Sequence, residues 1–337
     1  MSNLMRGGLA LARFTLARFT LSCLALLGCV LAAAAQQATP PAAMPLKVGV
    51  LKMAALTNPW VARERGIFAR NGLDVTLIEF RSGNEAIAAH RSGAVDIVLS
   101  IPGTAMTAAE RGFDLVAVAQ NEIAQKQNPD TGSIQVLKDS PYRTLADLAG
   151  KRIAVSGLHS QKTVSMQTVF RKAGVDPASL QLVEIPFPSQ FDALKSKQVD
   201  AVDTVDPYTT QLIASGIGRV IAWDYVDAIP EQPLGAWFAT AKFTRSNAAA
   251  VERFNKSIQE SIEYMRADSE RARSEVVAYT GLNAALVKDM PMIGWDYRVS
   301  REKWQQVVDM MHQNGELQSP HKAEEFFAEQ IKPYVVK

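Results

Sequence analysis

Short polar segments follow two neighbouring apolar runs of this chain, and they hold residue types that can bind a small ligand. Ser82, Gly83 and Asn84 come just after the first run, and Ser100 and Thr104 lie at the end of the second. Hydroxyls, side-chain amides and the free N–H groups at the start of a helix donate hydrogen bonds to anions such as a sulfonate or a carboxylate. These positions therefore indicate a ligand-binding site.

A second polar group follows the apolar run 152–155 and opens another helical pattern. It consists of Ser156, His159, Ser160, Gln161 and Lys162. Asp206 comes after a further apolar run, and an acid at that place suits an amine or a hydroxyl group better than an anion. Thr57 and Asn58 are expected to border the mouth of the same site. Together with the first group, these residues form the predicted binding set.

Each of these residues also has a purely structural interpretation. Four of them are types that cap helices: Asn58, Ser82, Ser100 and Asp206. His159 and Lys162 also suit a solvated loop and the solvent face of a helix. Both interpretations stay open at the level of the sequence.

Residues in a spacing typical of catalysis or of metal binding are missing from the sequence. The four histidines are scattered, without the spacing of metal ligands. Neither a G-x-S-x-G nucleophile motif nor a phosphate-binding P-loop occurs. We therefore predict no catalytic residue, no metal and no cofactor, so that the protein is not an enzyme.

The strand-end residues belong to two stretches with the same pattern. Residues 75–118 read as strand–helix–strand–helix–strand, and residues 180–222 repeat this order, with Asp96 and Asp200 at equivalent places. Parallel strands need a crossover helix, and ligands of open α/β sheets bind just past the carboxyl ends of the strands. The repeat predicts two similar α/β lobes that face each other, although any two such units look alike at this level.

Length and composition agree with a two-domain globular protein. The chain has 337 residues, 47% of them hydrophobic, and a net charge of +2. The basic cluster that nucleic-acid binding requires is absent, so no nucleic-acid partner is expected. The stretch 46–51 reads as the first strand, and 235–243 reads as a strand that returns the chain to the first lobe. From Ser246 onward the pattern is helical, without an evident strand.

The first 35 residues differ from the rest. Their only charges are three arginines, and residues 21–35 form an uncharged apolar run that ends in small residues. This pattern is typical of a secretory signal peptide, here residues 1–35, followed by a flexible leader at 36–45. A membrane anchor and lipid attachment at Cys29 are the alternatives. The predicted location is the periplasm.

Several motifs resemble one known family. LADLAGKRIAV at 145–155 is similar to the L-x-D-L-K-G-K-x-[IV]-A-V signature of periplasmic solute-binding proteins of the nitrate/sulfonate/taurine class, which serve ABC importers. RGIFARNGLDV at 65–75 and GAVD at 93–96 resemble further motifs of this class. The segment 200–208, which contains Asp206-Pro207, resembles a fourth. The resemblance covers about residues 46–335.

The resemblance implies a type II periplasmic-binding-protein fold in which two lobes close on a ligand by a hinge motion. Lobe one would contain residues 46–125 and a helical tail at 242–337, and lobe two residues 126–241. The chain would cross between lobes near 123–128 and near 239–243. The implied function is capture of a small organic anion and its delivery to a membrane permease by a monomeric protein.

Two other functions fit the same residues. A sensory or chemotactic binding module would share every feature and differ only in its membrane partner. The same fold family also contains thiamin-pyrimidine synthases, which are intracellular enzymes with a Cys-rich loop. Both cysteines here, Cys23 and Cys29, fall inside the predicted signal peptide. The enzyme is therefore the less favoured alternative.

Overall fold

A computed structural model describes residues 42–80 and 83–336. The predicted signal peptide 1–35, with Cys29, lies outside the described residues, and so does Ser82. The described residues from Ala43 onward belong to one compact unit. Within the described part, no helix is long and apolar enough to span a membrane.

The first sheet has five strands in the order β2-β1-β3-β10-β4. They are β1 (Met44–Leu51), β2 (Leu73–Phe80), β3 (Ile97–Ser100), β4 (Val116–Ile123) and β10 (Pro233–Ala239). β1 pairs in parallel with β2 and β3, whereas β10 runs antiparallel to β3 and β4. The connecting helices are η1 (Ala54–Leu56), α2 (Thr57–Glu64), α3 (Ile67–Arg70), α4 (Gly83–Arg91) and α5 (Pro102–Glu110).

The second sheet repeats this arrangement in the order β7-β6-β8-β5-β9. Its strands are β5 (Gly132–Leu137), β6 (Arg152–Val155), β7 (Gln181–Glu184), β8 (Ala201–Val205) and β9 (Gly218–Ala222). β5 takes the antiparallel place that β10 has in the first sheet. The associated helices are η2 (Leu145–Leu148), α6 (Gln161–Lys172), η3 (Pro177–Ser179), α7 (Phe187–Lys195), α8 (Tyr208–Ala214) and α9 (Asp224–Ala228).

The predicted internal repeat is confirmed by this topology. β2-α4-β3-α5-β4 corresponds to β7-α7-β8-α8-β9, element by element. The repeat extends to single hydrogen bonds. Asp96 accepts from the backbone N–H of Lys47 at 2.8 Å, and Asp200 accepts from that of Arg152 at 3.0 Å. In each sheet one carboxylate thus ties the start of the second strand of the repeat, β3 or β8, to its parallel neighbour, β1 or β6.

The chain passes from the first sheet to the second through residues 124–131, which join β4 to β5. It returns through residues 223–232, which contain α9 and join β9 to β10. The crossing expected near 239–243 is therefore wrong in position. β10 is buried along its whole length and is already paired with β4 at Pro233. The physical reason is that Pro233–Ala239 is a central strand of the first sheet and not a connection to it.

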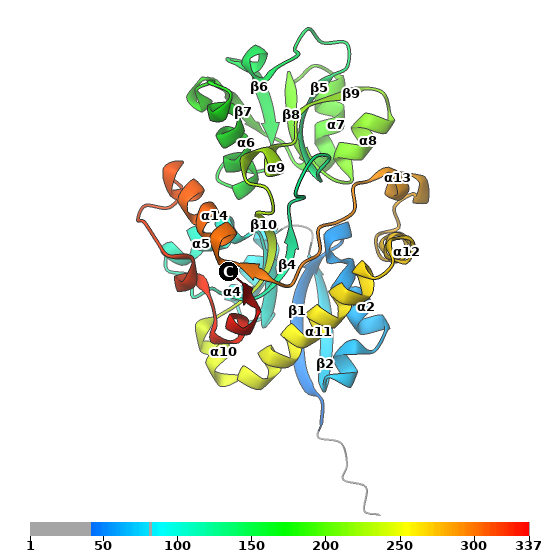
Figure 1. Ribbon diagram of the computed structural model, residues 1–337, viewed down its shortest axis with the longest axis vertical. Coiled ribbons are helices and arrows are strands. Elements are labelled where there is room, and N and C mark those ends of the chain that lie inside the picture. Colours follow the sequence, from blue (N-terminus) through cyan, green and yellow to red (C-terminus); the bar gives the residue numbers. More distant parts are fainter. Residues whose placement is uncertain (1–41, 81–82, 337) are drawn as a thin grey trace, which may run out of the picture. The chain divides into compact units, whose positions relative to one another are not determined.

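The C-terminal third is mainly helical, as predicted, but it adds two short strands that the sequence did not reveal. The elements are α10 (Ala241–Ser246), α11 (Ala248–Arg266), α12 (Ser269–Thr280), α13 (Ala284–Asp289), β11 (Val299–Ser300), α14 (Arg301–Gln313), η4 (Ala323–Phe326), η5 (Glu329–Tyr334) and β12 (Val335–Val336). α11 crosses diagonally in front of β1 and β2 in Figure 1. Its Phe254 packs edge-on against Trp237 of β10, with ring centres 5.4 Å apart. This contact places the core of the first sheet beneath α11.

Candidate functional site

The two residues predicted at the mouth of the site are buried in the first turn of α2. Thr57 Oγ1 donates to the carbonyl of Ala54 at 2.8 Å, and Asn58 Nδ2 donates to Asn121 Oδ1 at 2.9 Å. Asn121 Oδ1 also accepts from Trp237 Nε1 at 3.1 Å. Asn58 thus joins α2 to β4 of the first sheet, whereas Thr57 bonds locally to η1, and contact with a ligand stays a prediction for both.

Four predicted residues near the strand ends of the first sheet lie within the described part of the chain. Ser100 ends β3, is buried, and donates to the next carbonyl at 3.3 Å. Thr104, in the first turn of α5, is partly buried, and its hydroxyl has no partner among the described residues. Gly83 and Asn84 form the start of α4. Of these residues, Thr104 therefore keeps a hydroxyl that is free for a further hydrogen bond.

The equivalent segment of the second sheet lies between β6 and α6. Ser156 is partly buried, and its hydroxyl makes no hydrogen bond within the described ranges. Ser160 caps α6, since its Oγ accepts from Thr163 N at 3.2 Å. His159 is exposed, and its Nδ1 lies 3.0 Å from Glu316 Oε1. Only Ser156 of these three predicted residues is left without a structural partner.

Gln161 is the residue through which the two halves of the predicted site meet. Its Oε1 accepts a hydrogen bond from Gly103 N, at the start of α5, at 2.7 Å. Its Nε2 donates to Gln232 Oε1 at 3.0 Å and to the carbonyl of Pro233 at 2.8 Å. One buried side chain of α6 therefore contacts both the first helix after β3 and the return crossing.

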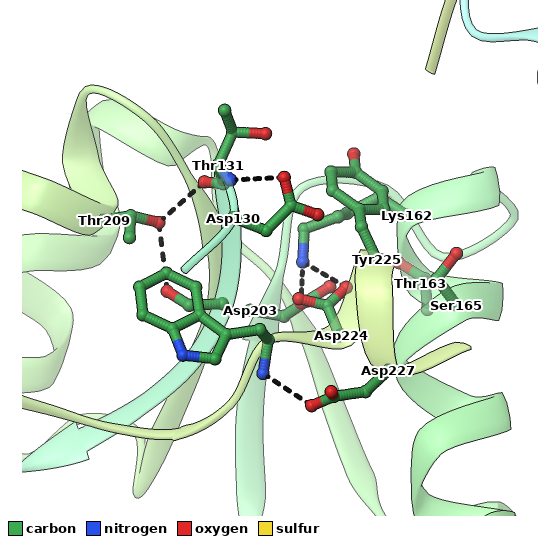
Figure 2. A network of polar contacts seen from close by, with 12 residues as sticks. Asp130, Thr131, Lys162, Thr163, Ser165, Asp203, Thr209, Asp224, Tyr225 and Asp227 are labelled. Carbon is green, nitrogen blue, oxygen red and sulfur yellow. Dashed lines mark hydrogen bonds and ion pairs between the residues drawn. The ribbon is translucent and has the colours of Figure 1, made fainter. Parts of the chain in front are cut away.

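Lys162 is held inside the protein. Its side chain is 1% exposed, its Nζ pairs with Asp203 of β8, and the same atom lies 2.6 Å from Asp224 Oδ2 of α9. Figure 2 shows the ammonium pointing to both carboxylates, with the ring of Tyr225 beside it. The predicted contact of Lys162 with an anionic ligand finds no support in this geometry, because the ammonium already pairs with Asp203 and Asp224.

Burial sets the protonation of this cluster. Burial opposes the charge of Lys162, but the two carboxylates outweigh that effect and raise the pKa of the ammonium. Burial also raises the pKa of Asp203 well above its ordinary value, and the neighbouring charge of Asp224 adds to the rise. Burial of two acids with one ammonium therefore disfavours the simultaneous ionisation of both carboxyls.

Asp130, which sequence reasoning did not select, lies in the first crossing and is 1% exposed. Its Oδ1 accepts from Thr131 N at 2.7 Å and from Gln125 N at 3.3 Å, while its Oδ2 is buried without a partner in the described part of the chain. Burial raises the pKa of Asp130 to about 6. The crossing thus holds a carboxyl oxygen that no protein donor satisfies.

Asp206, which was predicted, lies next to the same crossing. Its backbone N–H donates to the carbonyl of Thr131 at 2.8 Å, and its Oδ1 accepts from the N–H and the hydroxyl of Thr210 at 2.9 and 2.7 Å. Its Oδ2 is buried and unpartnered as far as the structure describes the chain. Burial raises the pKa of Asp206 to about 6, and the charge of Asp130 adds to the rise.

Glu122, near the end of β4, is the third acid beside the first crossing, and it too was missed. It lies deep in the protein but keeps some solvent access, and its carboxyl makes no hydrogen bond or ion pair in residues 42–80 and 83–336. Burial, with the charge of Asp130, raises its pKa to about 8. The only sequence signal was that both acids lie in the polar stretch 120–132, which ends in turn-forming residues.

A cavity of about 340 Å³ lies beside the same crossing, lined by Gln125, Lys126, Arg266 and Trp295 among others. None of the predicted site residues lines it. Within the described residues, no three acids, histidines or cysteines are grouped as metal ligands. The described site is therefore built from hydrogen-bonding groups and acids.

The family model for NMT1/THI5-like proteins matches residues 54–272 of this chain. The chain belongs to the NMT1/THI5-like family. This match begins at η1 and ends within α12, so it includes every strand of the two sheets except β1, and it agrees with the family resemblance in the sequence. A putative binding protein of Brucella abortus is 24% identical over 213 residues, 63% of this chain and 64% of that protein. The chain thus spans somewhat less than two thirds of the relatives that it matches first.

Solved structures show that this NMT1/THI5-like chain has the two-lobed fold of periplasmic binding proteins. The aliphatic sulphonate binding protein SsuA of Escherichia coli superposes with a TM-score of 0.70 at 20% identity, covering 84% of this chain and 97% of that one. The nitrate-binding protein NrtA of Synechocystis gives 0.68 at 12% identity, with 87% and 86% covered. A desulfurization enzyme, DSZB, shares the fold with a TM-score of 0.63 at 16% identity, covering 86% of this chain and 98% of that one.

Proposed function

We propose that this protein is the periplasmic substrate-binding component of an ABC importer. It would capture a small organic solute between its two sheets and deliver it to a membrane permease. The observation that carries the proposal is the position of Gln161, whose side chain contacts Gly103 of α5 and the return crossing at Gln232 and Pro233. Because this one side chain of α6 contacts both α5 and the return crossing, a change in the distance between the two sheets would also move the starts of α5 and α6 relative to each other.

The proposed lobes follow the two sheets. Lobe one contains residues 46–123 with residues 233–336, and lobe two contains residues 132–222. The two crossings, residues 124–131 and 223–232, would allow a hinge motion of the kind that closes periplasmic binding proteins. The protein would be open without ligand and more compact with it.

The names of two structural neighbours suggest a solute with an acidic group. SsuA is named as an aliphatic sulphonate binding protein and NrtA as a nitrate-binding protein. Thr104 and Ser156 support this class, because both present hydroxyls with no protein partner among the described residues. The start of α4 adds backbone N–H groups. A sulfonate or carboxylate between these elements would receive donors from both lobes.

Periplasmic location and the absence of catalysis belong to the same proposal. A cleaved signal peptide at residues 1–35 would export the protein. SsuA and NrtA are binding proteins by name, which supports binding without turnover, although DSZB shows that the fold also carries an enzyme. A sensory module would bind the same solute but copurify with a receptor instead of a permease.

The test is a thermal-shift screen of residues 36–337 against sulfonates, nitrate, carboxylates, pyrimidines and amino acids, followed by small-angle scattering with each hit. A solute at ~100 times its Kd adds about 2.7 kcal/mol to the free energy of unfolding and raises the melting temperature. We expect a hit that also lowers the radius of gyration and is recovered chemically unchanged. A hit that is converted to product, or complete absence of binding, would contradict the proposal.

A further inference from the structure

The segment that follows α13 runs along β4, on the side of this strand that faces away from β10. Ile123 N donates to the carbonyl of Gly294 at 2.8 Å. Asp296 N donates to the carbonyl of Asn121 at 3.2 Å, and an antiparallel bridge lies between these two bonds. We call residues 284–296, which comprise α13 and this segment, the strap. The end of the strap thus adds a short edge strand to the first sheet where the chain leaves for the second.

The strap is also bound to the first crossing. Gln125 Nε2 donates to the carbonyl of Met292 at 2.5 Å. The two crossings are in turn joined to each other, since Ala124 N donates to the carbonyl of Gln232 at 2.8 Å. A second bond of this kind runs from Glu231 N to the carbonyl of Gln125, at 3.2 Å. Both crossings and the end of the strap therefore form one hydrogen-bonded ribbon at the junction of the two sheets.

The backbone of the strap approaches β4 so closely that position 294 requires glycine. A Cβ at Gly294 would lie 2.2 Å from the carbonyl oxygen of Ile123 and 3.2 Å from its carbon. The backbone of a paired strand cannot swing aside as the end of a side chain can. A larger residue at position 294 would therefore push the strap away from β4.

The other end of the strap, α13, is fixed to the first sheet but reaches the second. Val287 and Met290 are buried in the same hydrophobic core as the first sheet. Arg273 of α12 donates from its Nη1 to the carbonyls of both residues, at 3.0 Å for Met290. α13 also lies beside α8 of the second sheet (Figure 1). Within the described ranges, no hydrogen bond or ion pair links α13 to α8.

The opposite side of the junction, where α6 meets α5 and α14 in Figure 1, is bonded by side chains. Gln161 of α6 bonds to α5 and to the return crossing. Arg171 Nη2, also of α6, donates to Asn314 Oδ1 at 3.0 Å, just beyond the end of α14. His159 Nδ1 lies 3.0 Å from Glu316 Oε1. The two sheets are therefore tied together at α6 and only touch at α13 and α8.

From this asymmetry we infer that the strap is a mechanical stop that sets the resting angle between the two sheets. Its end is fixed to the ribbon of the crossings, and α13 supports α8 without binding it. The second sheet can rotate away from α13, but it cannot come closer on that side, because packed elements do not interpenetrate. This inference rests on the hinge motion of the proposed function and adds the element that limits this motion.

Spin labels measure the positions of the strap and of the sheets directly. Both cysteines of the chain lie in the predicted signal peptide, so the mature chain carries labels only where cysteines are introduced. Gln211→Cys with Lys288→Cys reports the distance between α8 and α13, and Glu64→Cys with Lys195→Cys reports the separation of the sheets. All four residues are exposed. Pulsed electron paramagnetic resonance without ligand should give one narrow distance distribution for each pair.

Two variants release the strap at different points. Gly294→Ala pushes it away from β4, and Arg273→Met removes the guanidinium that binds α13. In each variant the distance between α8 and α13 should lengthen by about 3 Å or more, since helices in contact lie about 8–10 Å apart. The distribution of sheet separations should broaden about twofold, as further angles become populated. Arg253→Met, which removes an arginine bound to the carbonyl of Gly72, is the matched control and should change neither distance.

The outcomes separate this inference from the proposed function. An unchanged distance between α8 and α13 in both variants would overturn the stop. A longer distance at this contact with an unchanged distribution of sheet separations would also overturn it. Arg273→Met leaves the backbone pairing with β4 intact, so it decides the question if Gly294→Ala does not fold. The expected changes in both distances, together with no ligand in the thermal-shift screen, would leave the stop standing and overturn only the capture of a solute.

Discussion

The ammonium of Lys162 lies 2.6 Å from the carboxylate of Asp224, and this pair joins the first turn of α6 to α9. Asp203 of β8 completes the cluster from the sheet below. Sequence reasoning placed Lys162 among the ligand-binding residues. In the structure its ammonium pairs instead with two acids that are 41 and 62 residues away along the chain. The stability of the return crossing, which contains α9, therefore depends on this ion cluster.

Replacing the buried ammonium should destabilise the protein strongly. Lys162→Met leaves Asp203 and Asp224 buried without a counter-charge, and removal of one partner from a buried ion cluster costs about 3–5 kcal/mol. Urea denaturation measures this loss. Lys195→Met, which changes an exposed lysine at the end of α7, should stay within about 0.5 kcal/mol of wild type. A loss below about 1 kcal/mol for Lys162→Met would show that the cluster is not structural.

Removal of the Gln161 side chain should weaken the contact between α6, α5 and the return crossing. Gln161→Ala deletes three hydrogen bonds and leaves the buried N–H of Gly103 without an acceptor, at a cost of about 1–3 kcal/mol. The melting temperature should fall, and scattering should show a more extended protein without ligand. Gln259→Ala on the exposed face of α11 is the control. An unchanged scattering profile for Gln161→Ala would argue against a role in joining the sheets.

The pKa of Glu122 predicts how stability depends on pH. Burial raises this pKa from 4.5 to about 8, so between these values the folded protein binds more protons at Glu122 than the unfolded chain does. The free energy of unfolding therefore falls as the pH rises through this window. Asp130, with its pKa raised to about 6, acts in the same direction at lower pH.

Glu122→Gln should remove the contribution of Glu122 to this pH dependence. At about pH 8.5 the ligand-free variant should be more stable than the wild type by roughly 2 kcal/mol, an amount reduced by the solvent access of the side chain. Near pH 4.5 the difference should largely disappear. Thermal unfolding at both pH values measures it. Parallel pH profiles for the two proteins would mean that Glu122 ionises as an ordinary exposed acid.

The equivalent carboxylates Asp96 and Asp200 should contribute independently to stability. Each accepts a hydrogen bond from the backbone of the neighbouring parallel strand, at Lys47 N and Arg152 N, and each replacement by alanine should cost about 1 kcal/mol. The two sites belong to different sheets, so the losses should add in the double variant within about 0.5 kcal/mol. Chemical denaturation of the four proteins tests this. A large coupling energy would mean that the two hydrogen bonds do not contribute independently to the free energy of unfolding.

The sequence by itself determined the two-sheet organisation. The sequence shows near-continuous apolar runs, glycines that end helices, and aspartates at the matched positions 96 and 200. These features depend on which face of each helix or strand is buried, and residues close together in the sequence determine that face. The segment 57–70 forms two helices, since Gly66 adopts a left-handed φ of 65° between α2 and α3. Local deviations of this kind leave the order of the elements unchanged.

Only the tertiary structure decided which polar groups meet. Lys162 and Gln161 are adjacent in sequence. Lys162 is neutralised by a buried acid of α9, whereas Gln161 contacts α5 and β10. The return of the chain before Pro233 depends on strand pairing, and the grouping of Glu122, Asp130 and Asp206 depends on where the first crossing passes β8. Charges act through space and not along the chain, so their partners follow from topology, which local periodicity does not encode.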